Sequence, residues 1–203
     1  HSFPSRRSSD LGIYRYSDGK CHLHKAMGLV GDVFREMPPE FVADQGSMAI
    51  GHVRYSTSGD SNLINAQPFV VEFDTFNLGL AHNGNLSNGG YLRNHLKQGG
   101  AILQGTLDTE IILHLAARQH TMGSPPWEAL RAALKQTEGA YSIVALCEDG
   151  LAAYRVPYGF RPLIMGRLDD AVVFASESCA LDLIGATCER DVEPGEFIII
   201  RPD

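Results

Sequence analysis

Cysteine is scarce in this sequence, and the spacing of the few cysteines matches no binding pattern. The chain of 203 residues contains four of them, with no CxxC pair. This scatter argues against a disulfide framework and against a zinc site. Three of the four lie among apolar residues, where cysteine behaves as a small core side chain. The four cysteines are Cys21, Cys147, Cys179 and Cys188.

An excess of positive charge and long apolar runs are also lacking. The net charge is −7, and no five like charges follow one another. The sequence therefore has no electrostatic footprint for nucleic acid or for an anionic membrane surface, and a small polar metabolite is the better expectation. The apolar stretches are far shorter than a membrane span, and the first residues lack the apolar centre of a signal peptide. We expect no membrane association, and a cytoplasmic protein.

The order of the expected elements defines the fold class. Alternating residues predict hairpins at both ends of the chain, and helical patterns occupy its middle. This order favours an α+β fold, with two mainly antiparallel sheets packed together and helices outside, over alternating βαβ units. No internal repeat, GxGxxG pattern or P-loop is present. Strands are expected at 12–16, 21–25, 47–54, 69–73, 76–81, 140–147, 151–154, 163–166, 171–175 and 197–200, and helices within 29–34, 88–99, 111–118, 125–139 and 176–184.

The stretch from Leu80 to Leu86, Leu-Ala-His-Asn-Gly-Asn-Leu, is the most informative part of the chain. An apolar run ends at Ala81, which predicts a turn of the backbone over the next four residues. Asn83 and Gly84 tolerate unusual backbone angles, so amides can be aimed into a cleft there. An amide N–H beside an Asn side chain is the chemistry of an oxyanion hole. The alternative is an ordinary hairpin or strand-to-helix turn with Asn-Gly in it.

Two charged residues are candidates for binding a ligand. Arg54 stands at the end of an expected buried strand, before the hydroxyl-rich loop 55–59, where its fork of donors suits a carboxylate. The alternative is that Arg54 pairs with a structural Asp or Glu. Asp108 lies at the start of an expected helix, where it or Thr106 can cap free backbone N–H groups. Asp108 can also face a ligand ammonium.

Four separated strings together resemble the glutaminase domain of class II glutamine amidotransferases, the enzymes with an N-terminal nucleophile. The likeness is greatest to the amidophosphoribosyltransferase family within that group, and it runs from about Gly12 to Ile200. It implies a four-layer αββα Ntn-hydrolase sandwich. The strings are Gly-His-Val-Arg-Tyr-Ser-Thr at 51–57, Asn-Ala-Gln-Pro-Phe at 65–69, Ala-His-Asn-Gly-Asn-Leu at 81–86 and Asp-Thr-Glu at 108–110. Later motifs are Gly-Phe-Arg-Pro at 159–162, Ala-Ser-Glu-Ser-Cys-Ala-Leu at 175–181 and Arg-Asp-Val-Glu-Pro-Gly-Glu at 190–196.

The resemblance also implies roles for individual residues. An N-terminal Cys attacks the side-chain amide of L-glutamine, with its own α-amine as the base. Asn83 and the Gly84 N–H then hold the tetrahedral oxyanion. Arg54 binds the α-carboxylate, Thr57 adds a hydrogen bond and Asp108 takes the α-ammonium. The ammonia passes to a phosphoribosyltransferase domain and forms 5-phosphoribosylamine in purine biosynthesis. Mg²⁺ and, in some members, an iron–sulfur cluster belong to that other half, and members assemble as homo-oligomers.

The chain departs from the family pattern at both ends. Residues 1–11 show no periodicity, contain no Cys and match nothing in the family, so we interpret them as a foreign or disordered leader that replaces the N-terminal strand and helix. Residues 12–203 form the amidotransferase domain, and the phosphoribosyltransferase domain is absent. The chain is therefore predicted to be inactive alone. The alternatives are a non-catalytic glutamine-binding or regulatory module, or the glutaminase domain of another class II amidotransferase.

Overall fold

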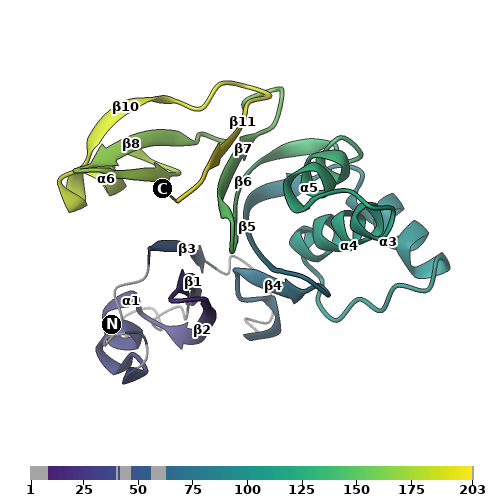
Figure 1. Cartoon of the computed structure of the whole chain (residues 1–203), viewed down its shortest axis with the longest axis horizontal. Helices are drawn as coiled ribbons and strands as arrows, with labels where there is room; N and C mark the ends of the chain where they lie inside the picture. The colour runs from purple at the N-terminus through teal and green to yellow at the C-terminus, as the bar shows by residue number, and fades with distance from the viewer. Residues whose placement is uncertain (1–8, 40, 42–46, 56–62, 203) are drawn as a thin grey trace, which may run out of the picture.

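The computed structural model describes residues 9–39, 41, 47–55 and 63–202. Its strands form three sheets, with the strand orders β2-β1-β3, β10-β8-β9 and β11-β7-β6-β5-β4, and each neighbouring pair is antiparallel (Figure 1). The strands are β1 (Ser9–Ser17), β2 (Lys20–Gly28), β3 (Met48–Tyr55), β4 (Phe69–Glu72), β5 (Asn77–Leu86), β6 (Gly139–Cys147), β7 (Gly150–Arg155), β8 (Ile164–Leu168), β9 (Ala171–Ala175), β10 (Thr187–Asp191) and β11 (Phe197–Ile200).

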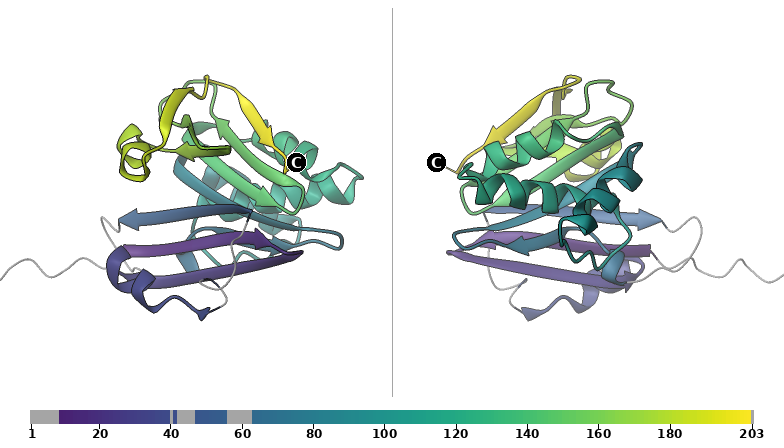
Figure 2. Two further views of the ribbon diagram at one scale, coloured as in Figure 1. Left: turned by 60° about the vertical axis from the view of Figure 1, so that its left-hand side comes forward. Right: turned by 90° about the vertical axis from the view of Figure 1, so that its right-hand side faces the viewer.

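The elements stack in four layers, as the sequence predicted. Helices α3, α4 and α5 cover one face of the five-stranded sheet, and the two three-stranded sheets lie against its other face (Figure 2). Helix α6 packs on the outer side of the β10-β8-β9 sheet, where Leu181 lies directly over Gly166. The helices are α1 (Val30–Val33), α3 (Gly89–Gln98), α4 (Asp108–Thr121), α5 (Pro126–Leu134) and α6 (Ser178–Ile184), with short 3₁₀ turns η1 (Phe34–Glu36) and η2 (Leu63–Asn65).

The first hairpin is confirmed, but it begins earlier than the sequence predicted. Asp18 and Gly19 both have positive φ, at 47° and 77°, and close a tight turn between β1 and β2. Residues 9–11 were predicted to belong to a foreign or disordered leader, and disorder is wrong for them, because β1 begins at Ser9 and Leu11 is buried. The polar stretch gave no local sign of this strand, because the charge of its buried Asp10 is compensated by Arg54, 44 positions along the chain. Residues 1–8 lie outside the described part of the chain.

The predicted turn after Ala81 is also wrong. Strand β5 continues to Leu86, and its residues from Gly79 onward pair antiparallel with those of β6, with Asn83 opposite Ser142. The cause is that β6 supplies main-chain partners for a stretch that looks like a turn by composition. Gly84 still departs from a regular strand, because its φ is 137°. A Cβ at Gly84 would lie 2.0 Å from the Ala140 carbonyl oxygen, so only glycine fits there.

Helix positions were predicted better than helix caps. The residues Asn88, Leu107 and Glu177 hold the N-cap positions of α3, α4 and α6, and none of their side chains caps its own helix. Asn88 instead bonds across to the chain after α5, donating to the Gln136 carbonyl at 2.9 Å. The cap that the sequence predicted from Thr106 or Asp108 at the start of α4 is therefore not formed. Asn88 and Asp108 instead bond to residues of other segments, which sequence spacing alone does not show.

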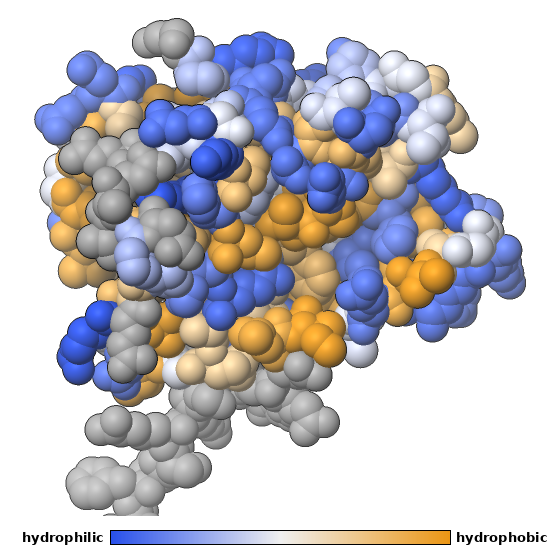
Figure 3. All heavy atoms as spheres, turned by 60° about the horizontal axis from the view of Figure 1, so that its bottom comes forward, coloured by the Kyte–Doolittle hydropathy of each residue, from blue (hydrophilic) through white to orange (hydrophobic). Residues whose placement is uncertain are grey.

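The main core lies between α3, α4, α5 and the five-stranded sheet. It contains fully buried Leu96, Ile111 and Leu130 from the helices, and Trp127 follows Pro125 and Pro126 at the start of α5. Apolar side chains also remain uncovered elsewhere, as the face in Figure 3 shows. None of the helices within the described ranges is long and apolar enough to cross a bilayer.

Candidate active site

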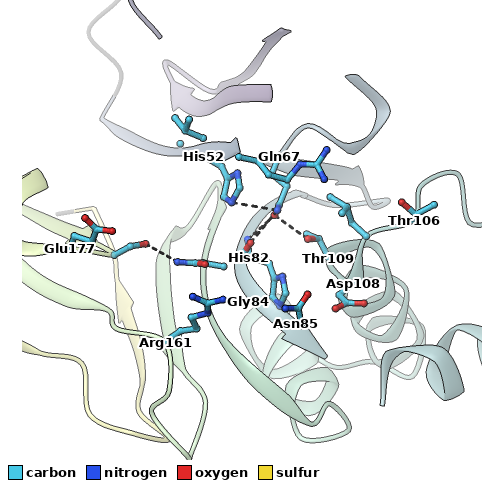
Figure 4. A pocket seen from close by; sticks show the side chains of 16 residues that line it. His52, Gln67, His82, Gly84, Asn85, Thr106, Asp108, Thr109, Arg161 and Glu177 are labelled. Carbon is cyan, nitrogen blue, oxygen red and sulfur yellow. Dashed lines mark hydrogen bonds between the residues drawn. The ribbon is translucent and has the colours of Figure 1, made fainter. Parts of the chain in front are cut away.

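A pocket of about 840 Å³ lies where the layers meet, and six segments of the chain line it (Figure 4). One wall comes from the end of β3, residues 51–54, and from Gln67. The floor is residues 82–85 of β5, and a second wall is residues 106–109 at the start of α4. Arg161 and the pair Ser176 and Glu177 close the remaining side. The volume is in the range of small-molecule sites.

Arg54 is held by a carboxylate that the sequence analysis had placed in the leader. Its Nε lies 2.8 Å and its Nη2 2.5 Å from Asp10 Oδ2, and Nε is 3.0 Å from Oδ1. Asp10 is completely buried, whereas 27% of the Arg54 side chain stays exposed toward the pocket. The alternative of a structural ion pair is therefore realised. The contacts use one edge of the guanidinium, and Nη1 is not among the atoms that bond Asp10.

Asn83 and Gly84 lie side by side on the pocket floor. The Asn83 side-chain amide donates to Ser176 Oγ at 3.4 Å, a long contact with the segment that follows β9. Backbone at Gly84 reaches this position only because of its positive φ and its close approach to β6. The two residues thus present an amide group at the place where the sequence predicted an oxyanion hole.

Asp108 links the start of α4 to the end of β5. Its Oδ2 accepts the Leu86 backbone N–H at 2.7 Å, so it is not a cap of its own helix. Its Oδ1 lies close to the backbone at Gly89, where a Cβ would come within 2.8 Å. The carboxylate also lines the pocket. One oxygen is therefore fixed by the fold, and the group presents negative charge to a ligand.

Gln67 and two histidines form a buried polar network behind the floor. Gln67 Oε1 accepts the His82 N–H at 2.7 Å and the Thr109 hydroxyl at 3.0 Å, and Gln67 Nε2 donates to the His82 carbonyl at 3.1 Å. Gln67 Nε2 also lies 3.5 Å from His52 Nε2. Burial lowers the pKa of His52, and it lowers the pKa of His82 from 6.5 to about 4. Both imidazoles are therefore neutral near pH 7.

The far wall carries two further charged groups. Arg161 and Glu177 both line the pocket, and both are exposed (Figure 4). Within the described residues neither forms an ion pair. The Arg161 charge adds to the lowering of the His82 pKa. Both residues belong to motifs that the sequence analysis quoted without assigning them a role.

The cysteines lie away from the pocket lining. Burial raises the pKa of Cys147, which is fully buried, and also that of half-buried Cys21. A hydrogen bond to Glu177 raises the pKa of Cys179, which is exposed. None of these three is a poised thiolate in the pocket. In the part of the chain that the structure describes, no cluster of three His, Cys, Asp or Glu residues could hold a metal ion.

Four of the five predicted site residues meet in this pocket: Arg54, Asn83, Gly84 and Asp108. The fifth, Thr57, lies outside the described residues. Asp10 was not predicted as a site residue, because a stretch without periodicity gives no reason to expect a buried carboxylate. It quoted Gln67 in a motif, and only the contacts of its side chain reveal its place in the network. The roles of these residues in a reaction stay predictions.

Comparison with known proteins agrees with this arrangement. The model of the glutamine amidotransferase domain family matches residues 52–183. Amidophosphoribosyltransferase 1, chloroplastic, of Arabidopsis thaliana is 46% identical over 205 residues, covering 100% of this chain and 36% of the relative. The Rhizobium etli amidophosphoribosyltransferase is 42% identical and covers 100% and 41%. The structure of glutamine phosphoribosylpyrophosphate amidotransferase from B. subtilis superposes with a TM-score of 0.86 at 37% identity, over 97% of this chain and 42% of that one.

The family match extends over more than half of the chain, and the chain therefore belongs to the glutamine amidotransferase domain family, with the Ntn-hydrolase fold of its class II members. Within that family it groups with the amidophosphoribosyltransferases, the enzymes that its named relatives represent. The chain spans between 36% and 42% of the length of these relatives. It corresponds to their glutaminase part.

Proposed function

We propose that this domain hydrolyses L-glutamine and supplies the ammonia to an amidophosphoribosyltransferase reaction, the formation of 5-phosphoribosylamine in purine biosynthesis. The observation that carries the proposal is that Arg54, Asn83, Gly84 and Asp108 line one pocket. Glutamine is a zwitterion with a reactive amide at its far end. A site with a cation, an anion and amide donors offers one partner to each of these groups.

The charges of the pocket suit a neutral zwitterion better than a simple anion. Asp10 compensates most of the Arg54 charge, and the pair leaves one edge of the guanidinium for a carboxylate. Asp108 keeps one oxygen for a ligand ammonium while the other holds Leu86. The two groups stand on different elements, β3 and α4, so a ligand that bonds to both is fixed at its α-carbon end. Its side chain then extends toward Asn83 and Gly84.

The nucleophile in this proposal is an N-terminal cysteine, as the family resemblance implies. Two apolar clefts, of about 220 and 420 Å³, continue from the pocket between the edges of β3 and β9, and Gly51 lines the pocket and both clefts. Among the described strands, β3 pairs only with β1 and β9 only with β8. Such free strand edges accept a further extended segment. This groove supports the proposal that a cysteine-bearing segment reaches Asn83 from there.

The deciding experiment compares glutamine hydrolysis by the chain as it stands and by a version in which residues 1–8 are replaced by a family-type segment beginning Cys-Gly after removal of Met. The replacement ends before Ser9, because Asp10 and Leu11 are buried in β1. The matched control begins Ser-Gly. We expect glutamate and ammonia only from the Cys-Gly version, and a loss of about 100- to 1000-fold in kcat when Asn83 is changed to Ala.

Two outcomes would contradict the proposal that this domain hydrolyses glutamine. A folded Cys-Gly version that neither binds nor hydrolyses L-glutamine would refute the proposal. Binding without hydrolysis, measured by calorimetry on both versions, would favour a non-catalytic glutamine-binding module. The cytoplasmic location expected from the sequence stays a prediction, and some named relatives are chloroplast proteins. A phosphoribosyltransferase domain as the acceptor of the ammonia belongs to the same proposal.

A further inference from the structure

At the edge of the five-stranded sheet, the side chain of Gln67 makes the hydrogen bonds to β5 that the main chain of β4 does not make. Strand β4 pairs with β5 from Phe69, opposite Leu80, to Glu72, opposite Asn77. Continued by two residues, this register places Gln67 opposite His82. Pro68 has no N–H to donate, and the Gln67 side-chain amide bonds both the N–H and the carbonyl of His82 instead, at 2.7 and 3.1 Å. The amide thus takes the place of a strand partner.

The same amide reaches two other walls of the pocket. Its oxygen also accepts the Thr109 hydroxyl at 3.0 Å, and its nitrogen lies 3.5 Å from His52 Nε2 (Figure 4). Gln67 is 4% exposed, Thr109 is fully buried, and both polar atoms of the amide are used. Each partner is a near neighbour of a substrate-binding candidate. His82 precedes Asn83, Thr109 follows Asp108, and His52 stands two residues before Arg54 on the same side of β3.

We propose that Gln67 is a positioning residue that sets the relative placement of the oxyanion donors on β5 and the ammonium-binding carboxylate on α4. The proposal rests on the function proposed above and assigns a role to a pocket-lining residue through its bonds to His82 and Thr109. The Gln67 amide joins three segments at this point of the pocket, because Gln67 leads into β4, His82 lies on β5 and Thr109 lies on α4. Its removal is therefore expected to misplace Asn83 and Asp108 relative to each other.

The state of the two histidines is consistent with this role. For Gln67 Nε2 to donate toward His52, the imidazole must carry its proton on Nδ1 and accept at Nε2. Burial lowers the pKa of His52 and keeps it neutral, as this bond requires. His52 Nδ1 and His82 Nε2 are buried and have no partner in the described structure. Gln67 therefore supplies the hydrogen bonds that connect His82, Thr109 and His52 within this network.

The hydrogen bonds of the Gln67 amide to β5 and to α4 can be tested separately by substitution. Gln67→Met keeps the length of the side chain and removes every hydrogen bond of its amide. Thr109→Val removes only the hydrogen bond between Gln67 and α4. Gln98→Met, at an exposed position on α3, is the matched control. The measurements are hydrogen exchange of the His82 and Gly84 amides in the chain as it stands, affinity for L-glutamine in the same chain, and kcat and KM in the Cys-Gly version.

The expected results differ between Gln67→Met and Thr109→Val. Gln67→Met accelerates exchange of the His82 amide, weakens glutamine binding about tenfold and lowers kcat by about tenfold or more, since each lost hydrogen bond is worth about a factor of ten. Thr109→Val raises KM by about tenfold and leaves kcat and the His82 exchange within about twofold of the parent. Gln98→Met leaves all of them unchanged. A residue that only stabilised the fold would not divide its effects between kcat and KM in this way.

Three outcomes overturn the inference. In the first, Gln67→Met lowers the unfolding temperature but leaves exchange and kinetics like those of Gln98→Met. In the second, Thr109→Val lowers kcat as much as Gln67→Met does. In the third, Gln67→Met does not fold and Thr109→Val leaves KM unchanged. If the folded Cys-Gly version neither binds nor hydrolyses glutamine, the proposed function fails instead, and unchanged His82 exchange in Gln67→Met would then separately refute the positioning role.

Discussion

Removal of Arg54 is expected to destabilise the fold before it affects any ligand. Asp10 is completely buried, and its contacts to Arg54 are the ion pair that compensates its charge. Breaking a buried ion pair from one side costs about 3–5 kcal/mol, because the remaining charge stays buried without its partner. Arg54→Leu should therefore lose about 3–5 kcal/mol of unfolding free energy, which lowers Tm by about 6–20 °C for a chain of this size.

The reverse substitution should cost less. In Asp10→Leu the guanidinium that remains is 27% exposed and can reach water in the pocket, so about 1–3 kcal/mol is expected. The double variant Asp10→Leu with Arg54→Leu leaves no buried charge. Its stability should return to within about 1–2 kcal/mol of the parent, because an apolar pair often replaces a buried ion pair at little cost.

Urea unfolding followed by the fluorescence of the single tryptophan, Trp127, measures these differences. Trp127 is buried in the main core and far along the chain from the substituted residues, so it reports the global transition. The matched control is Arg190→Leu, which breaks the exposed pair with Glu196 and should change stability little. The reasoning is refuted if Arg54→Leu costs no more than Arg190→Leu, or if the double variant is as unstable as Arg54→Leu.

Three further predictions concern the pocket floor and the pH dependence of stability. Gly84→Ala should prevent correct pairing of β5 with β6, because its Cβ would meet the Ala140 carbonyl at 2.0 Å; circular dichroism and glutamine affinity should both show a loss, and an unchanged affinity would contradict it. Since the pKa of His82 falls from 6.5 to about 4 on folding, the unfolded chain binds the proton first, and stability should fall by about 3 kcal/mol as the pH drops from 6.5 to 4; His82→Gln should flatten this part of the curve. The pKa of His120 is raised by its hydrogen bond to the Ser124 carbonyl and by its bond to Asp74, so the stability from these contacts is present at low pH and is lost as the pH rises through the raised pKa; NMR titration of Asp74→Asn should show a lower His120 pKa, and an unchanged one would refute the pairing with Asp74.

The structure also changes how variants of the binding residues must be read. Arg54 and Asp108 each serve the fold and the pocket, through Asp10 and through Leu86. Loss of glutamine binding in a variant of either residue is therefore informative only when the protein is shown to be folded at the temperature of the assay. Asn83 is the cleaner test of the reaction, since the hydrogen bond of its side chain among the described residues is a long contact to Ser176.

Local signals in the sequence were enough to predict most elements. The β1–β2 turn follows from Asp18 and Gly19, which adopt positive φ easily. The start of α5 follows from consecutive prolines, and the hairpin of β6 and β7 from two apolar runs around a short polar turn. The motif strings were enough to predict the family, because the residues that carry it lie close together within each string.

What the sequence by itself determined about this protein is its order of elements, its family and four residues that line the pocket. Only the tertiary structure decided that Asp10 belongs to β1 and pairs with Arg54, that β5 runs through Asn83 and Gly84, and that Gln67 joins three walls. The physical reason is the same in each case. These contacts join residues 15 to 59 positions apart, and a buried charge or a polar strand is stable only when its partner arrives from elsewhere in the fold.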